Sequence, residues 1–160
     1  MHVAAGQSPF RIGVISDTHG LMRSGIREIL AGCAHIFHAG DIGTPAVLEQ
    51  LQSIAPLSAV RGNVDYGVWT EKLPWTIACS CGDHHLYMRH VIEDMDINPQ
   101  GQFDIVIHGH SHEPRNEVID GVRYFNPGSA GPQRFHLPIT LGIIELKDGE
   151  INAQHIEIAG

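Results

Sequence analysis

Short apolar runs alternate with amphipathic segments over the first half of the chain. Phe10–Asp17 is short, apolar and rich in β-branched residues, which indicates a buried strand. Apolar side chains at helical spacing follow over Ser24–Cys33 and again after Thr44-Pro45, a pair typical of a helix N-cap and first turn. His35–Asp41 and Leu57–Asn63 supply two more short strands. This strand–helix order predicts a parallel sheet with right-handed crossovers.

The second half of the chain has the pattern of mostly antiparallel strands. Trp75–Cys81 and His85–His90 are joined through a Gly-Asp turn, and Phe103–His108 is another buried strand. Val118–Asn126 and Thr140–Ile158 each fold about an Asp-Gly pair, which is a strong hairpin signal. We therefore expect two sheets with flanking helices, packed as one α/β sandwich.

Length and composition indicate one folded domain. At 160 residues, 42% of them hydrophobic, the chain can bury about two-thirds of its unfolded surface. Residues 1–9 lack the basic start and apolar core of a signal peptide, and we expect them to be a flexible lead-in to a single domain over residues 10–160. No apolar stretch approaches the roughly 18 residues of a membrane span. Three cysteines give no disulfide framework, so a reduced, cytoplasmic protein is expected.

The net charge of −8 argues against an extended nucleic-acid surface, which needs clustered Lys and Arg to displace counterions. A small anionic substrate remains compatible with this charge, because bound metal ions can reverse the local field. Histidine is the unusual residue, at 12 of 160 positions. A solvated surface has no need of so many imidazoles.

Side chains that bind metals follow four of the predicted strands. Asp17-Thr18-His19 follows the first, Gly40-Asp41 the second, Gly62-Asn63 the third, and Gly109-His110-Ser111-His112 a later one. Ligands bind beyond the carboxyl ends of strands in open α/β sheets, so we expect these side chains to meet at one edge. Each aspartate alone could be an ordinary turn residue, and each histidine a surface residue. Chance would not place all of them at four strand ends.

The mixture of imidazole, carboxylate and amide suits a borderline transition metal such as Mn, Fe, Co, Ni or Zn. Six candidate ligands exceed the three protein ligands of an ordinary catalytic zinc, and a structural zinc site would be richer in cysteine. A two-metal site would use all six and needs a bridging carboxylate. Asp41 is the obvious bridge because it is central in the order of the candidates.

Five short blocks resemble the signature blocks of the calcineurin-like metallophosphoesterases, most closely the small single-domain bacterial and archaeal phosphodiesterases. They are DTH at 17–19, GD at 40–41, GN at 62–63, GHSH at 109–112 and NPGS at 126–129. The resemblance covers about residues 10–145. It implies a four-layer α/β sandwich of two mixed β-sheets flanked by helices. It also implies hydrolysis of small phosphodiesters with two divalent metal ions, manganese ahead of Fe, Zn, Ni or Co.

The resemblance implies a role for each candidate ligand. One metal would take Asp17, His19 and His112, the other Asn63 and His110, and both would share Asp41. The second metal needs one more histidine, at the end of a strand between the GN and GHSH blocks. His90 is the candidate there, and His84 and His85 are rivals at the start of the same strand. Val91 and Ile92 depart from the glycine and histidine that similar proteins have after this position.

Asp41, Asn63 and His110 are the expected catalytic residues. Two cations would hold a bridging hydroxide against phosphorus. In larger members of the superfamily, a histidine after the GN asparagine protonates the leaving group. Val64 occupies that position here. The small phosphodiesterases also lack that histidine, so its absence agrees with the resemblance. Residues expected to support the ligands or to contact substrate are His38, Arg61 and Asp65. An ordinary core histidine is an equal alternative for His38.

Two other functions compete with this one. A subunit of the retromer sorting complex shares the fold and acts as a protein-binding scaffold with an incomplete catalytic set. The GHSH histidines, which such a scaffold tends to lose, are present here and favour the enzyme. A metal-dependent nuclease is a third alternative, against which the acidic balance and the short chain argue. The sequence leaves the oligomeric state open, and a two-fold homodimer is the commonest one for a small domain.

Overall fold

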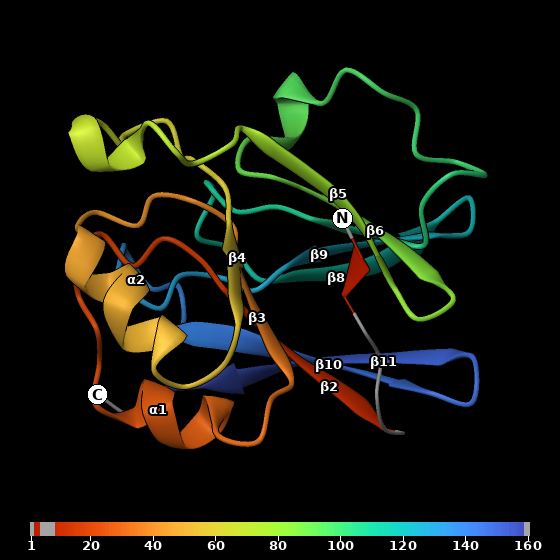
Figure 1. The fold of residues 1–160 in the computed structure, drawn as a ribbon, viewed down its shortest axis with the longest axis horizontal. Coiled ribbons are helices and arrows are strands. Elements are labelled where there is room, and N and C mark those ends of the chain that lie inside the picture. Colours follow the sequence, from red (N-terminus) through yellow and green to blue (C-terminus); the bar gives the residue numbers. More distant parts are fainter. Residues whose placement is uncertain (1, 4–8, 159–160) are drawn as a thin grey trace.

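The computed structural model describes residues 2–3 and 9–158 (Figure 1). Its strands are β1 (His2–Val3), β2 (Phe10–Ile15), β3 (His35–His38), β4 (Leu57–Ala59), β5 (Thr76–Cys81), β6 (His84–Arg89), β7 (Ile105–Ile107), β8 (Arg115–Ile119), β9 (Val122–Asn126), β10 (Thr140–Lys147) and β11 (Glu150–Glu157). Its helices are α1 (Gly25–Leu30), α2 (Pro45–Gln52) and the 3-10 helices η1 (Val68–Thr70) and η2 (Ile92–Asp94).

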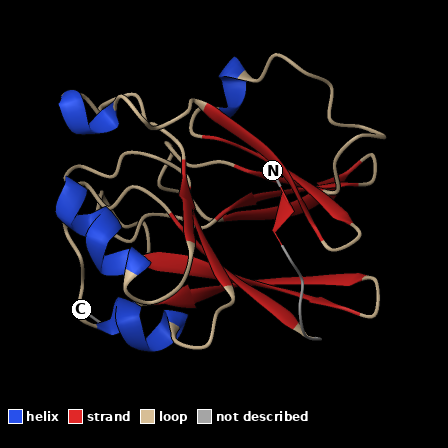
Figure 2. Cartoon of the chain, viewed as in Figure 1, coloured by secondary structure: helices blue, strands red, loops and turns tan. Residues whose placement is uncertain are grey.

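The strands form two mixed sheets, as the resemblance implied (Figure 2). The five-stranded sheet has the order β11-β10-β2-β3-β4, in which β2, β3 and β4 are parallel, as the sequence predicts. The β10–β11 hairpin joins β2 in antiparallel fashion. The six-stranded sheet has the order β1-β5-β6-β7-β9-β8. In it, β7 runs parallel to β6 and β9, while β5–β6 and β8–β9 are antiparallel hairpins.

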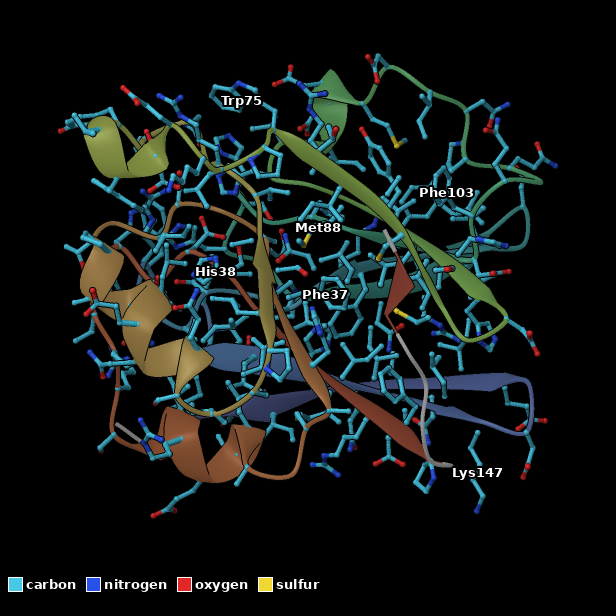
Figure 3. All side chains as sticks on the ribbon, in the orientation of Figure 1. Phe37, His38, Trp75, Met88, Phe103 and Lys147 are labelled. Carbon is cyan, nitrogen blue, oxygen red and sulfur yellow. The ribbon has the colours of Figure 1, made fainter. Side chains whose placement is uncertain are left out.

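Alternation along the strands divides the apolar side chains between two faces of each sheet. On β2, Ile12 and Val14 face the six-stranded sheet and join Phe37, Met88 and other residues in the core between the sheets (Figure 3). Ile15 of the same strand belongs to the core on the opposite face. This period of two is what a strand buried on both faces requires. The two sheets therefore pack face to face over a shared apolar core.

Helices α1 and α2 cover the outer face of the five-stranded sheet. Ile26 and Leu30 of α1, with Val47 and Leu51 of α2, are buried in the core on that side. Thr44 has the extended backbone of an N-cap residue and Pro45 begins α2, as the sequence predicts. The outer face of the six-stranded sheet is covered by η2 and the chain after it, through residues that pack on Tyr87, Val106 and Val122. This fourth layer contains a 3-10 helix instead of an α-helix.

The beginning of the chain contains one strand that the sequence did not predict. His2–Val3 pairs in parallel with β5, opposite Ser80 and Cys81. Residues 1 and 4–8, the rest of the expected lead-in apart from residue 9, lie outside the described residues. Within the described ranges, no helix is both long and apolar enough to cross a membrane.

Candidate metal centre

Five strands end at the same edge of the sandwich, and each is followed by one or two of the candidate ligands. They are Asp17 and His19 after β2, Asp41 after β3, Asn63 after β4, His90 after β6, and His110 and His112 after β7. The structure therefore brings the predicted residues of four strand ends together and adds the end of β6.

Asp17, His19 and His112 form the first cluster of ligand atoms, all within 4.8 Å of one another. His112 Nε2 lies 3.3 Å from Asp17 Oδ1, and His19 Nε2 lies 3.8 Å from the same oxygen. The two imidazole nitrogens face each other at 3.3 Å. An oxygen and two ring nitrogens thus converge on one small volume, which is the arrangement a divalent cation needs.

Asp41, His90 and His110 form the second cluster, again within 4.8 Å. His90 Nε2 lies 3.0 Å from Asp41 Oδ2, and the rings of His90 and His110 meet edge to face with centroids 5.4 Å apart. Asn63 lies beside this cluster, with Oδ1 3.1 Å from His110 Nδ1. His84 and His85 are at the other end of β6, and His84 Nε2 contacts the backbone oxygen of Gly149. Only His90 of these three histidines lies in the cluster.

Asp41 lies between the two clusters. Its Oδ1 accepts a hydrogen bond from the backbone N–H of Val64, which leaves Oδ2 directed at the histidines. This Oδ2 lies 3.0 Å from His90 Nε2 and 3.9 Å from His19 Nε2, one nitrogen in each cluster. The position suits a carboxylate shared by two cations.

Three buried atoms of the proposed ligands have no hydrogen-bond partner among the described residues: His112 Nδ1 and, 3.9 Å apart, Asp17 Oδ1 and His90 Nε2. The Nε2 of His90 is close to Asp41, but the two groups are not aligned as a hydrogen bond. The side chains of Asp17 and His90 are 0% and 2% exposed, so water does not satisfy them freely. Unpaired buried polar atoms are costly, and a cation between Asp17 Oδ1 and His90 Nε2 would remove that cost. The donor set therefore fits divalent metal ions.

The carboxylates and His90 shift one another's ionisation. Burial would raise the pKa of Asp17, but contact with His112 and the charge of His90 bring it below its ordinary value. Burial would likewise raise the pKa of Asp41, which contact with His90 lowers overall. Burial would lower the pKa of His90, but Asp41 and Asp17 raise it overall. Both carboxylates are thus held ionised, and a cation would compete with the proton that the raised pKa of His90 favours.

Supporting hydrogen bonds direct one atom of each ligand into the site. Asp17 Oδ2 accepts from Ser16 Oγ at 2.6 Å and from the backbone N–H of His110 at 3.1 Å, so Oδ1 faces the cluster. His90 Nδ1 donates to the carbonyl of Ala39 at 2.7 Å, which leaves Nε2 for a cation. Second partners of this kind fix the orientation and tautomer of metal-binding histidines.

The backbone of the ligand loops is left-handed at five ligands. Their φ angles are 55° at Asp17, 45° at His19, 56° at Asp41, 73° at His110 and 63° at His112. Only three other non-glycine residues in the described ranges have positive φ. Such conformations cost free energy and persist where the surroundings hold them, typically at functional sites.

Glycines before two ligands allow the loops to approach closely. A Cβ on Gly62 would lie 2.1 Å from the backbone nitrogen of Asp41, and one on Gly109 would lie 2.2 Å from Ser16 Oγ. Neither distance is possible for a real side chain. The glycines of the GN and GHSH blocks therefore permit the contact between strand ends that assembles the two clusters.

His38 lies behind the ligand loops, fully buried, and does not reach either cluster. Its Nδ1 accepts from the N–H of Gly40 at 3.1 Å, so its Nε2 carries the proton and donates to Thr18 Oγ1 at 3.0 Å. Burial lowers the pKa of His38 to about 4, so the ring is neutral near pH 7. It joins the loop after β2 to the loop after β3.

Two residues of the NPGS block also hold the ligand loops, a role that the sequence did not reveal. Asn126 Nδ2 donates to the carbonyl of Gly109 at 3.0 Å, and Ser129 Oγ donates to the carbonyl of Asp17 at 3.0 Å. In the sequence, residues 126–129 stood out as one of the five blocks that resemble a family signature. The polar side chains of Asn126 and Ser129 are the feature of the sequence from which this role could have been predicted.

Asp65 is 3% exposed, and its carboxylate is occupied by backbone donors. It accepts from the N–H groups of Ile42 at 3.2 Å, Gly43 at 3.0 Å and Gly62 at 2.9 Å. These bonds tie the loop that carries Asp41 to the loop that carries Asn63. The carboxylate therefore supports the ligands and has no oxygen directed at a substrate.

Replacing Asp65 with asparagine is expected to lower the free energy of unfolding by about 2 kcal/mol, because the new amide N–H would oppose backbone N–H groups. Urea denaturation of the variant checks this, with Asp96→Asn on the surface as the matched control. The shape of the pH profile of kcat/KM should be unchanged. Unchanged stability together with loss of the basic limb of that profile would instead make Asp65 a proton donor.

Comparison with known proteins agrees with this geometry. The chain is 27% identical, over 91% of each sequence, to a probable metallophosphoesterase of Methanothermobacter thermautotrophicus. It is 26% identical to a phosphodiesterase of Methanocaldococcus jannaschii, over 88% of this chain and 95% of that one. Among solved structures, Vacuolar Protein Sorting 29 from Cryptosporidium parvum superposes with a TM-score of 0.76 over 95% of this chain and 99% of that chain, at 18% identity.

A family model decides the assignment. The model of the calcineurin-like phosphoesterase superfamily domain matches residues 10–149, which span the strand ends that carry all seven candidate ligands. The order of the sheets and the composition of the two clusters agree with that match. The chain therefore belongs to the calcineurin-like phosphoesterase superfamily.

Proposed function

We propose that the protein hydrolyses phosphodiester bonds of small substrates at a centre of two divalent metal ions. The observation that carries this proposal is the pair of three-residue clusters with Asp41 Oδ2 directed at both. The names of two relatives, a probable metallophosphoesterase and a phosphodiesterase, support the reaction class.

The proposed ligands divide between the two ions. Asp17, His19 and His112 would hold one, Asn63, His90 and His110 the other, and Asp41 would bind both. A bound pair of cations supplies Lewis acidity at phosphorus and an activated water nucleophile. Manganese is the metal we expect first, with Fe, Zn, Ni and Co as alternatives, because imidazole and carboxylate ligands accept all of them.

The residues themselves position the reaction. Asp41 would bind both ions, and Asn63 would offer a neutral oxygen to the second. His110 is exposed beside Asn63, where it can contact a phosphoryl oxygen. Val64 stands next to Asn63 and offers no proton to the leaving group. Substrates whose leaving group departs without protonation, such as nitrophenyl esters, are therefore expected to react fastest.

An activity screen tests the proposal. Protein stripped of metal and reloaded separately with Mn, Fe, Co, Ni or Zn is assayed against bis(4-nitrophenyl) phosphate and 4-nitrophenyl phosphate. Turnover of the diester above that of the monoester is expected with at least one metal, and no turnover with stripped protein. Absence of turnover with every metal would reject the proposal in favour of a protein-binding scaffold, the role that we consider for this fold because of its likeness to Vacuolar Protein Sorting 29.

A further inference from the structure

A small cavity opens beside the second cluster, where the ends of the two sheets meet. Asn63 and His90, two proposed ligands, form one wall. Arg61, Trp75, Arg89 and Asp94 form the rest together with Val91. Arg61 follows β4 of one sheet and Arg89 ends β6 of the other, so an arginine from each sheet lines the cavity. Figure 3 shows Trp75 at the same end of the molecule.

Arg61 is held in place but keeps donors free. Its backbone N–H donates to the carbonyl of Pro74 at 2.8 Å, and its Nε donates to the carbonyl of Asp65 at 3.1 Å. Its guanidinium stacks on Trp75, 4.8 Å from the ring centroid. Its two Nη groups donate to nothing among the described residues. A fixed guanidinium with free donors is well suited to a planar or tetrahedral anion.

Arg89 has no compensating partner in the described part of the chain. It is half-buried, and its side chain makes no hydrogen bond or ion pair with the described residues. Asp94 lines the same cavity but pairs with neither arginine. The chain carries a net charge of −8 and only 10 Lys and Arg. Two arginines at one small cavity therefore make this region more positive than the chain as a whole. Their positive charge predicts an anionic occupant.

The cavity limits the size of that occupant. Its volume of about 40 Å³ is enough for roughly three water molecules. The half-buried Val91 adds an apolar wall beside His90. A carboxylate or a phosphate group fits this volume.

We propose that this cavity binds a second anionic group of the substrate while the phosphodiester lies at the metal centre. The inference rests on the proposed phosphodiesterase function and names its substrate class, small diesters with a carboxylate or phosphate near the reacting phosphorus. Asn63 and His90 border both sites, so a short spacer joins the two groups.

Matched esters test the inference. The substrates are 4-nitrophenyl 2-carboxyethyl phosphate, its 2-phosphonoethyl counterpart and 4-nitrophenyl propyl phosphate, which share one leaving group. The ratio of kcat/KM for each anionic ester to that for the propyl ester is measured in the wild type, Arg89→Gln, Arg89→Lys and the control Arg27→Gln. Arg27 is an exposed α1 residue bound to Ser53. Intrinsic reactivity is the same for every variant, so a change in ratio reports the protein.

The ratio for at least one anionic ester is expected to fall about tenfold in Arg89→Gln, the effect of one lost charged hydrogen bond. Arg89→Lys should keep part of the preference, and Arg27→Gln should keep all of it. A fall for the 2-carboxyethyl ester indicates that the cavity binds a carboxylate, and a fall for the 2-phosphonoethyl ester indicates that it binds a phosphate. Calorimetry provides a second readout: the wild type should bind 3-phosphonopropionate about tenfold more tightly than propylphosphonate, and Arg89→Gln should not.

The two hypotheses fail differently. Hydrolysis of all three esters with ratios unaltered by Arg89→Gln would overturn the anion site and leave the phosphodiesterase standing. Failure of the wild type to hydrolyse any of them would contradict the phosphodiesterase itself. Equal binding of the two phosphonates would then reject the anion site independently of activity.

Discussion

Replacing Asp41 with asparagine is expected to reduce kcat/KM for bis(4-nitrophenyl) phosphate by at least about a thousandfold, equivalent to roughly 4 kcal/mol of transition-state stabilisation. The reason is the position of Oδ2, 3.0 Å from His90 Nε2 and 3.9 Å from His19 Nε2. An amide removes the negative charge that both proposed ions share. Bound metal, measured by mass spectrometry, should fall for both ions, because Asp41 reaches a histidine of each cluster.

The matched control is Asp83→Asn, which makes the same change at an exposed hairpin position. It should retain both metals and full turnover. A variant at position 41 that kept two ions per chain and more than a tenth of the activity would show that Asp41 is not the bridge.

Replacing His90 with alanine is expected to have the second-largest effect, a loss of about a hundredfold in kcat/KM. This histidine is one of the two buried members of the second cluster, and its Nε2 has no hydrogen-bond partner among the described residues. Bound metal should fall from two ions per chain towards one, because Asp17, His19 and His112 are untouched. Metal content and activity are measured on the same preparation.

His84→Ala and His85→Ala are the controls on the same strand. Both residues lie at the opposite end of β6 from the clusters, and His84 contacts Gly149 there. They should keep two ions and full activity. If His84→Ala or His85→Ala lost a metal and His90→Ala did not, the assignment of the second site would be wrong.

Much of the fold follows from local pattern. Alternating apolar residues predict the buried strands, and the Asp-Gly pairs at 120–121 and 148–149 predict two hairpins that the structure confirms. The carboxyl ends of β2, β3 and β4 meet because the strands are parallel, so the convergence of Asp17, Asp41 and Asn63 was also predictable.

Strand ends were predicted less well, for a physical reason. The sequence predicts a strand over 57–63, but β4 ends at Ala59. Val60 is fully buried, so its apolar side chain gives no sign of the change. The backbone N–H of Arg61 instead bonds to Pro74, a partner that lies outside the sheet. Burial is visible in a sequence pattern, whereas the identity of a backbone partner is not.

Supporting contacts were the least predictable part of the site. Asn126 and Ser129 hold backbone oxygens of the ligand loops across long separations in sequence. The left-handed backbone at the five ligands was equally hidden, since aspartate and histidine adopt it only where their surroundings impose it. For Asp65, the sequence left contact with substrate open, and the three backbone N–H groups at its carboxylate indicate a supporting role instead.

Each cluster draws its side chains from both sheets. Asp17 and His19 come from the five-stranded sheet and His112 from the other, and Asp41 faces His90 and His110 across the same boundary. Ions bound there would link the two sheets at this end of the sandwich. Removing the ions with a chelator would then weaken the contact between the two sheets and abolish turnover together. The same ions would support both the stability of the sandwich and its activity.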